Sequence, residues 1–192
     1  MAQSIEVIAQ QGLNAYRAGD YDAALVAWQQ MIELEPDNTD AYNNLGATLY
    51  QLGELDAAAQ AYRQALEINA NSADTYNNLG TVLVLQENYD EAIEAYGQAI
   101  ELNPALPEPY VNLGNLLPPD QAVDAYQKAI QLNPNYKEAH NNLGTALFDL
   151  GQLEDAIASY NQALRIDPNF QAAQDNLAAV EAILADESVG VD

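Results

Sequence analysis

Apolar residues recur along the chain with the spacing of an α-helix, in short segments that end at glycine or proline. In DAYNNLGATLYQL, residues 40–52, the apolar positions fall three or four residues apart. That segment stops near Gly53, and DAAAQAYRQALEI, residues 56–68, again has helical spacing. Because glycine and proline terminate helices, this pattern predicts pairs of helices joined by short turns.

The same pair of segments returns with a period of 34 residues. NNLG occurs at 43–46, 77–80 and 141–144, with VNLG at 111–114. In the full-length blocks, an alanine follows the aligned glycine after twelve residues and an aromatic residue after sixteen, namely Trp28, Tyr62, Tyr96 and Tyr160. This alignment predicts repeats at residues 5–38, 39–72, 73–106, a short one at 107–136, and 137–170.

The period and the glycine–alanine–aromatic pattern resemble the tetratricopeptide repeat (TPR) family over residues 5–170. The resemblance implies an all-α fold, a right-handed superhelical α-solenoid of antiparallel helix pairs. It also implies that the first helix of each pair lines a concave groove. We therefore expect a single solenoid domain over residues 1–192.

The ends of the predicted helices carry their own signals. A carboxylate stands near the start of every second helix and is expected to cap it or to favour its dipole: Asp22, Asp56, Asp90, Asp120 and Glu154. Residues 171–185 are expected to form a helix that caps the apolar end of the solenoid. Its buried stripe would contain Leu177, Val180 and Leu184. Residues 186–192 are expected to be a frayed acidic tail.

The asparagines of NNLG are the first candidates for a binding site. A helical wheel places the second asparagine of each pair opposite the core, in register across four repeats: Asn44, Asn78, Asn112 and Asn142. The first asparagines, Asn43, Asn77 and Asn141, flank this line. Side-chain amides pair with both the N–H and the C=O of a peptide backbone, and some TPR proteins hold peptides with such an asparagine ladder. The alternative is that the amides are merely tolerated on a polar face or bond the neighbouring repeat.

Two further lines of residues accompany the asparagines. Tyr16, Tyr50 and Phe148, with Val84, occupy one outward position near the end of the first helix and would either anchor a ligand or pack between repeats. Asp40 and Asp74, with Glu108 and Glu138, lie one turn before the asparagines. These acids would either attract a basic ligand or favour the helix dipole.

The fourth repeat, residues 107–136, is four residues shorter than the others. Its first helix should halt at Pro118–Pro119, because proline lacks the backbone donor and clashes with the preceding turn. The shortening is either a neutral trimming of a loop or a functional notch, in which a ligand turns or leaves the groove or which changes the pitch of the superhelix.

Composition narrows the function classes. The formal net charge is −24, with 29 acidic and five basic residues, which disfavours nucleic acid as a partner. There is no cysteine, no apolar run of the roughly 20 residues that span a bilayer, and no secretory signal pattern at the N-terminus. We expect no membrane insertion and, by default, a cytoplasmic location.

No catalytic or cofactor motif stands out. The single histidine, His140, falls at the core-edge position held by Tyr42, Tyr76 and Tyr110 in other repeats, so a structural role is expected. EPDNTD, residues 35–40, has several oxygen donors but lacks the glycine and distal glutamate of a calcium loop. We expect no enzyme activity, no cofactor and no metal site.

The sequence thus favours a non-catalytic interaction module that binds an extended, basic or neutral segment of a protein or peptide through the asparagine ladder. The alternative is a structural scaffold or assembly factor that self-associates as a homo-oligomer or docks larger complexes.

Overall fold

The computed structural model describes residues 4–189, which contain eleven α-helices and no strand. The chain divides into two compact units, Met1–Asn103 and Pro104–Asp192, called here the N-terminal and C-terminal units. The all-α prediction is confirmed. A single solenoid over residues 1–192 stays a prediction, and each unit is described by itself.

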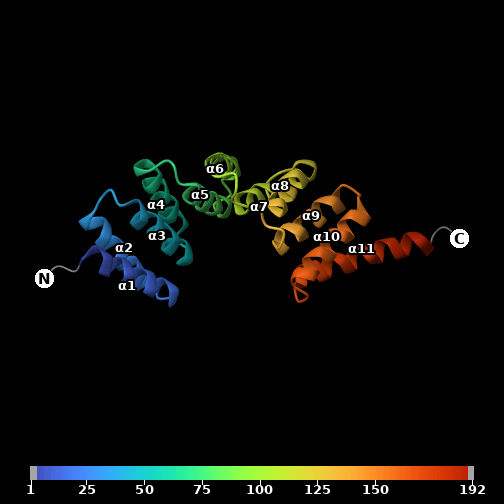
Figure 1. The fold of residues 1–192 in the computed structure, drawn as a ribbon, viewed down its shortest axis with the longest axis horizontal. Coiled ribbons are helices and arrows are strands. Elements are labelled where there is room, and N and C mark those ends of the chain that lie inside the picture. Colours follow the sequence, from blue (N-terminus) through green and yellow to red (C-terminus); the bar gives the residue numbers. More distant parts are fainter. Residues whose placement is uncertain (1–3, 190–192) are drawn as a thin grey trace. The chain divides into compact units, whose positions relative to one another are not determined.

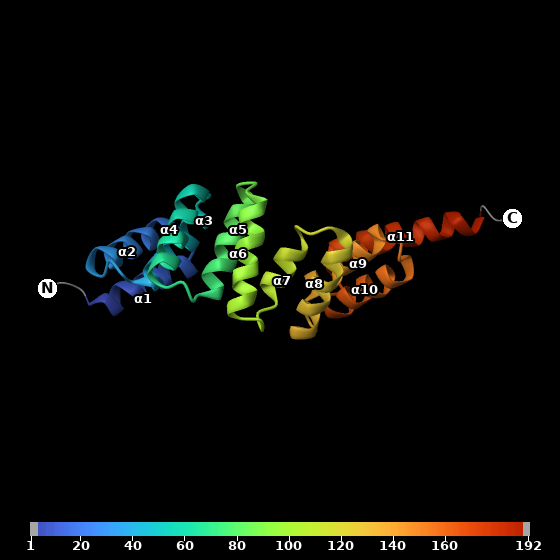
Figure 2. The ribbon, with the colours of Figure 1, turned by 90° about the horizontal axis from the view of Figure 1, so that it is seen from above.

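The N-terminal unit consists of three helix pairs, drawn in blue to green in Figure 1. Neighbouring helices along the chain pack against one another, and the first helices of the second and third pairs, α3 and α5, also touch. Figure 2 shows the third pair side by side. The helices are α1 (Ile5–Arg17), α2 (Tyr21–Leu34), α3 (Thr39–Gln51), α4 (Leu55–Ile68), α5 (Ala73–Leu85) and α6 (Tyr89–Leu102).

The C-terminal unit consists of two helix pairs and a final helix. Its central helix, α9, packs against α8, α10 and α11. The helices are α7 (Glu108–Gly114), α8 (Pro119–Leu132), α9 (Lys137–Asp149), α10 (Leu153–Ile166) and α11 (Gln171–Val189). Among the described helices of both units, none combines the length and the apolar character needed to cross a membrane.

The last helix, α11, covers the apolar end of the C-terminal unit. Val180 is buried, and Leu177 and Leu184 pack against the same core. The helix continues to Val189, four residues beyond the end that the sequence suggests, so the expected frayed tail is helical at residues 186–189. Its remaining part, residues 190–192, lies outside the described residues.

Within each pair, a glycine of the first helix lies directly against an aromatic ring of the second. A Cβ atom added to Gly80 would stand 2.6 Å from Cε1 of Tyr96, far inside van der Waals contact. The same overlap arises in the other four pairs, between Gly12 and Trp28, Gly46 and Tyr62, Gly114 and Tyr126, and Gly144 and Tyr160. All five rings are buried, so these contacts fix how closely the paired helices approach.

The turn inside each of the four full-length pairs has one residue in the left-handed region of backbone conformation. Gly19, Gly53 and Gly151 fill this position with φ of 77°, 77° and 74°. In the third pair the residue is Glu87, at φ 62°. A non-glycine residue in this conformation costs about 1–2 kcal/mol. The turn between α5 and α6 is therefore the most strained of these four turns.

The capping residues lie two positions earlier than the sequence suggests. Asp20 is the N-cap of α2, and its carboxylate accepts a 3.1 Å hydrogen bond from the Ala23 N–H. The other second helices begin after Glu54, Asn88, Pro118 and Gln152. The predicted caps, Asp22, Asp56, Asp90, Asp120 and Glu154, lie instead in the first turn, where a negative charge interacts favourably with the helix dipole.

The glycine–ring contact predicts opposite effects for two exchanges in the N-terminal unit. Gly80→Ala should lower the free energy of unfolding by about 1–3 kcal/mol, because the added methyl overlaps Tyr96. Gly97→Ala on α6 is the matched control. No atom lies within 4 Å of its added Cβ, so the higher helix propensity of alanine should raise stability by up to about 1 kcal/mol. Urea unfolding followed by circular dichroism measures both, and equal shifts would contradict the close-contact account.

Candidate functional site

The asparagine pairs lie on the first helices of the repeats, as the wheel predicts. Asn43 and Asn44 belong to α3 and Asn77 and Asn78 to α5, two helices in contact within the N-terminal unit. The remaining asparagines are in the C-terminal unit, with Asn112 on α7 and Asn141 and Asn142 on α9. Two of the four predicted ladder residues, Asn44 and Asn78, thus lie on contacting helices, and the other two lie in the C-terminal unit on helices that share no extensive contact.

The first asparagine of a pair connects its repeat to the next helix layer. The Thr75 hydroxyl on α5 donates a 3.2 Å hydrogen bond to Oδ1 of Asn43 on α3. In the C-terminal unit, the Asn176 amide on α11 donates at 3.0 Å to Oδ1 of Asn141, a residue only 8% exposed. At these two positions the amide bonds the neighbouring repeat or capping helix, as the alternative reading of the sequence proposes.

The second asparagines are half-buried and have two different environments. Within residues 4–189, the side-chain amides of Asn44 and Asn78 make no hydrogen bond. The amide of Asn142 is engaged, because its Nδ2 donates at 2.9 Å to Oδ1 of Asn115 and its Oδ1 accepts at 3.2 Å from Asn141. The N-terminal unit thus presents two amides with unused hydrogen-bonding capacity on adjacent helices.

The predicted aromatic anchors are half-buried and contact other aromatic or core residues. Tyr16 meets Tyr21 edge to face, with ring centroids 5.5 Å apart. Phe148 packs against the core of the C-terminal unit. Burial raises the pKa of Tyr62, and the nearby Tyr16 and Tyr50 add to that effect. These surroundings favour packing as the main role of the aromatic residues.

The acidic line occupies the starts of the first helices. Asp40 and Asp74 are exposed in the first turns of α3 and α5, and Glu108 and Glu138 have the same place in α7 and α9. The related Glu6 on α1 shows the effect of this position, since a backbone hydrogen bond and then one from Ser4 lower its pKa. The acids therefore favour the helix starts and also place negative charge beside the asparagines.

The shortened fourth repeat opens a pocket in the C-terminal unit. Helix α7 has 7 residues, whereas α9 has 13, and the chain between Gly114 and Pro119 forms one wall. The pocket has a volume of about 270 Å³. It is lined from the fourth repeat by Gly114, Asn115, Leu117, Pro119, Ala122 and Tyr126, and from α9 by Asn142, Thr145, Ala146 and Asp149.

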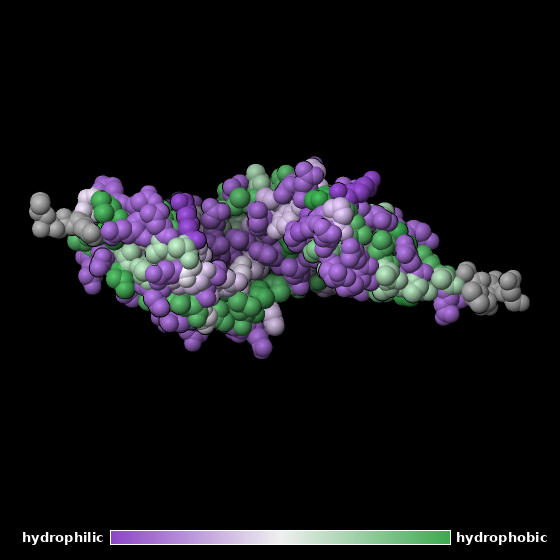
Figure 3. Space-filling view, turned by 90° about the horizontal axis from the view of Figure 1, so that it is seen from below, coloured by the Kyte–Doolittle hydropathy of each residue, from purple (hydrophilic) through white to green (hydrophobic). Residues whose placement is uncertain are grey.

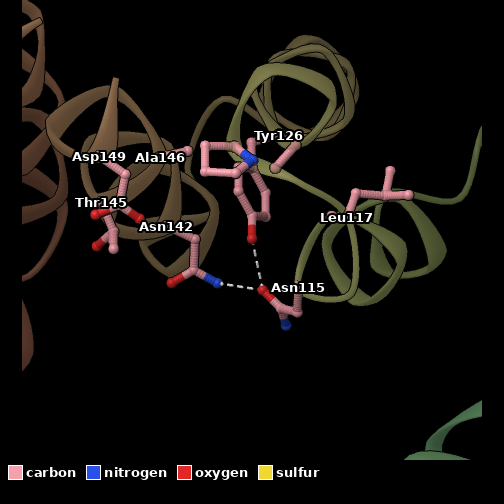
Figure 4. Close-up of a pocket in the computed structure, with 10 residues that line it drawn as sticks. Asn115, Leu117, Tyr126, Asn142, Thr145, Ala146 and Asp149 are labelled. Atoms are coloured by element: carbon pink, nitrogen blue, oxygen red, sulfur yellow. Dashed lines mark hydrogen bonds between the residues drawn. The ribbon is translucent and has the colours of Figure 1, made fainter. Parts of the chain in front are cut away.

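Figure 4 shows Asn115 and Asn142 facing each other at this pocket, with the Tyr126 hydroxyl directed to Asn115. Tyr126 donates at 2.8 Å to Asn115 Oδ1, the atom that also accepts from Asn142. Sequence reasoning missed Asn115 and Asp149. The available signal was that Asn115 follows the repeat glycine directly, at the position of Ala47 and Thr81 in preceding repeats.

His140 has the structural role that its position predicts. It is buried, and its Nε2 donates at 3.0 Å to the Pro134 carbonyl. Tyr110 donates to the Pro104 carbonyl at 3.3 Å from the equivalent position. In the part of the chain that the structure describes, no group of three histidine, aspartate or glutamate side chains has an arrangement that would hold a metal ion.

Family models cover most of the sequence. Models described as tetratricopeptide repeat match residues 10–74, 61–94 and 138–170, and one described as TPR repeat matches residues 80–117 and 120–151. The chain belongs to the tetratricopeptide repeat family. The fold and family of this TPR protein support a function as a protein–protein interaction module.

Several solved structures share its fold. The crystal structure of MamA protein is 25% identical, with a TM-score of 0.75 over 88% of this chain and 94% of that one. PilF of Pseudomonas aeruginosa is 24% identical, with a TM-score of 0.77 over 94% and 90%. YrrB, whose structure is described as a TPR protein with an unusual peptide-binding site, is 23% identical, with a TM-score of 0.70 over 85% and 87%. No curated protein sequence matches the chain significantly.

The buried tyrosine beside the pocket predicts a stability loss in alkali. Burial raises the pKa of Tyr126 to about 12, above the value of about 10 for an unfolded tyrosine. The folded TPR protein thus favours the neutral phenol, and this contribution is complete below about pH 10 and is lost as the pH rises through about 12. In Tyr126→Phe, the free energy of unfolding should fall less steeply over this range, as urea titrations at several pH values would measure. An unchanged slope would contradict the prediction.

Proposed function

We propose that the chain is a non-catalytic interaction module that holds an extended peptide or protein segment on the face formed by the first helices α3 and α5 of the N-terminal unit. One observation carries the proposal. Adjacent helices α3 and α5 present the amides of Asn44 and Asn78 without hydrogen-bond partners in the described residues, whereas the preceding Asn43 is occupied by Thr75. Such amides suit a ligand with regularly spaced donors and acceptors.

An extended peptide backbone has this spacing. First helices in contact lie roughly 8–10 Å apart, and an extended chain advances about 3.3 Å per residue, so Asn44 and Asn78 would meet backbone groups about three residues apart. Each amide bond contributes about 0.5–1.5 kcal/mol net. Because ordering the peptide opposes binding, side-chain contacts must supply much of the affinity.

Charge favours a basic or neutral partner. Asp40 and Asp74 are exposed one turn before the two asparagines, and the whole chain has a formal net charge of −24. Salt should therefore weaken the binding of a basic segment. YrrB, a protein of the same fold, is described as having a peptide-binding site, which makes peptide binding compatible with this architecture. A cytoplasmic location stays a prediction.

The test separates the two members of the asparagine doublet. A peptide selected from a random library on the full chain serves as the probe, with affinity measured by fluorescence polarisation. Asn44→Ala with Asn78→Ala should weaken binding by about tenfold, the effect of losing about 1.4 kcal/mol. Stability should not fall, because alanine is the better helix former.

Asn43→Ala is the matched control for that double variant. It removes the bond from Thr75, and the better helix propensity of alanine partly offsets that loss, so the free energy of unfolding should fall by less than about 1 kcal/mol. The affinity for the selected peptide should be nearly unchanged. Equal affinity of the double variant and the unmodified chain would refute the role of the free amides, as would failure to select any peptide.

A scaffold or assembly function through self-association is the second candidate. Three large apolar residues are exposed at the last position of the second helices in the N-terminal unit: Leu34 at 54%, Ile68 at 38% and Leu102 at 39%. Their equivalent placement is suited to contact with another chain. Light scattering over a range of concentrations should then show oligomers that glutamine at these three positions reduces. A monomer at every concentration would exclude this candidate.

A further inference from the structure

The pocket of the short fourth repeat has a carboxylate on one wall and apolar side chains on the opposite wall. The proposed binding mode does not use this pocket. Its wall toward α9 carries Asp149, the only acidic or basic residue among the lining residues. Within residues 4–189, no ion pair engages this carboxylate. The opposite wall is apolar and includes Leu117 and Pro119. An occupant would therefore meet an apolar surface and an unpaired negative charge.

The neutral polar groups of the pocket are largely satisfied from within the protein. Asn115 Oδ1 accepts from both Tyr126 and Asn142. The Thr145 hydroxyl donates to the Asn141 carbonyl and accepts from Tyr160, both at 3.3 Å. These bonds hold the side chains in place and leave the Asp149 carboxylate as the strongest free acceptor. Figure 4 shows Asp149 and Thr145 on the α9 side, away from Leu117.

The size of the pocket is suited to a small occupant. A volume of about 270 Å³ lies below the range of about 300–1,000 Å³ that is typical of sites for whole small molecules. A single long side chain is the better fit. Arginine lays its methylene stem along apolar surface and directs a planar fork of N–H donors to a carboxylate. Asp149 beside an apolar wall is the complement of that side chain.

We propose that this pocket of the C-terminal unit receives an arginine side chain of a protein or peptide partner. The proposal rests on the proposed function and adds to it a chemical requirement on the ligand. The pocket is specific to one place in the chain, because α7 ends early only in the fourth repeat. Moreover, the residue equivalent to Asp149 is Arg17, Gln51 or Leu85 in the first three repeats. The C-terminal unit therefore offers this combination of a shortened helix and a carboxylate at one place, where α7 ends and α9 passes.

The experiment titrates the full ¹⁵N-labelled chain with arginine blocked at both ends, as its N-acetyl methylamide. Chemical-shift changes should concentrate at the side-chain amides of Asn115 and Asn142. Blocked citrulline has nearly the same shape without the charge, and blocked lysine has the charge without the planar fork. Both should bind at least about threefold more weakly than arginine. A threefold change in affinity corresponds to the free energy that one exposed charge pair contributes. Equal binding of lysine or citrulline would overturn the assignment to arginine.

Two charge-matched variants locate the effect. Asp149→Asn should lower the affinity for blocked arginine by about threefold. Asp155→Asn removes the same charge from the exposed surface of α10 and should leave it unchanged. Salt screening affects both variants alike, so a difference between them reports the pocket itself. The same affinity in Asp149→Asn and Asp155→Asn, or shift changes elsewhere than the pocket, would overturn the proposal.

The outcome is distinguishable from that of the proposed function. The peptide assay reports on Asn44 and Asn78 in the N-terminal unit, whereas blocked arginine is too short to need them. Binding of arginine that depends on Asp149 supports the pocket even if the peptide assay fails. Conversely, a selected peptide whose affinity depends on Asn44 and Asn78 leaves the proposed function intact if Asp149→Asn has no effect on arginine binding.

Discussion

The contact between a glycine and an aromatic ring is the constraint on which every helix pair depends. The rings of Trp28, Tyr62, Tyr96, Tyr126 and Tyr160 occupy the space that a β-carbon on the facing glycine would fill. This contact brings the two helix axes close and buries the ring almost completely. Large side chains dominate the energy of such cores, so the small residue opposite is as necessary as the ring itself.

The fold followed from the sequence because this constraint is local and repeated. The aromatic residue follows the glycine after sixteen residues in the full-length repeats and after twelve in the short repeat. This spacing predicts the helix pairing without knowledge of any distant contact. Helix starts were less predictable. Asp22 was expected to cap α2, yet Asp20 accepts the capping bond, because both residues are favourable near a helix start and the wheel does not decide which one is the cap.

The candidate site was predictable only in part, because helical wheels describe one helix at a time. They predict which face of one helix Asn44 and Asn78 occupy, but they do not reveal that the partner of Asn43 is Thr75 in the next repeat, or that the partner of Asn141 is Asn176 in the final helix. The pocket, too, is formed by residues of two different repeats. Proline at positions 118 and 119 explains why α7 ends early, whereas the charge in the pocket comes from Asp149 on α9, which no pattern within the fourth repeat reveals.

The stability of the fold explains the first asparagine of a doublet but not the second. Each asparagine within a helix is less favourable than alanine by roughly 0.5–0.7 kcal/mol. At Asn43 the bond from Thr75 offsets this cost by connecting α5 to α3. At Asn44 and Asn78 no bond within the described chain offsets it, so folding gains nothing from the amide at either position. This uncompensated cost is the physical basis of our proposal that the two amides bond a molecule outside the chain, and the exposed acids one turn away are the basis for expecting that molecule to be basic or neutral.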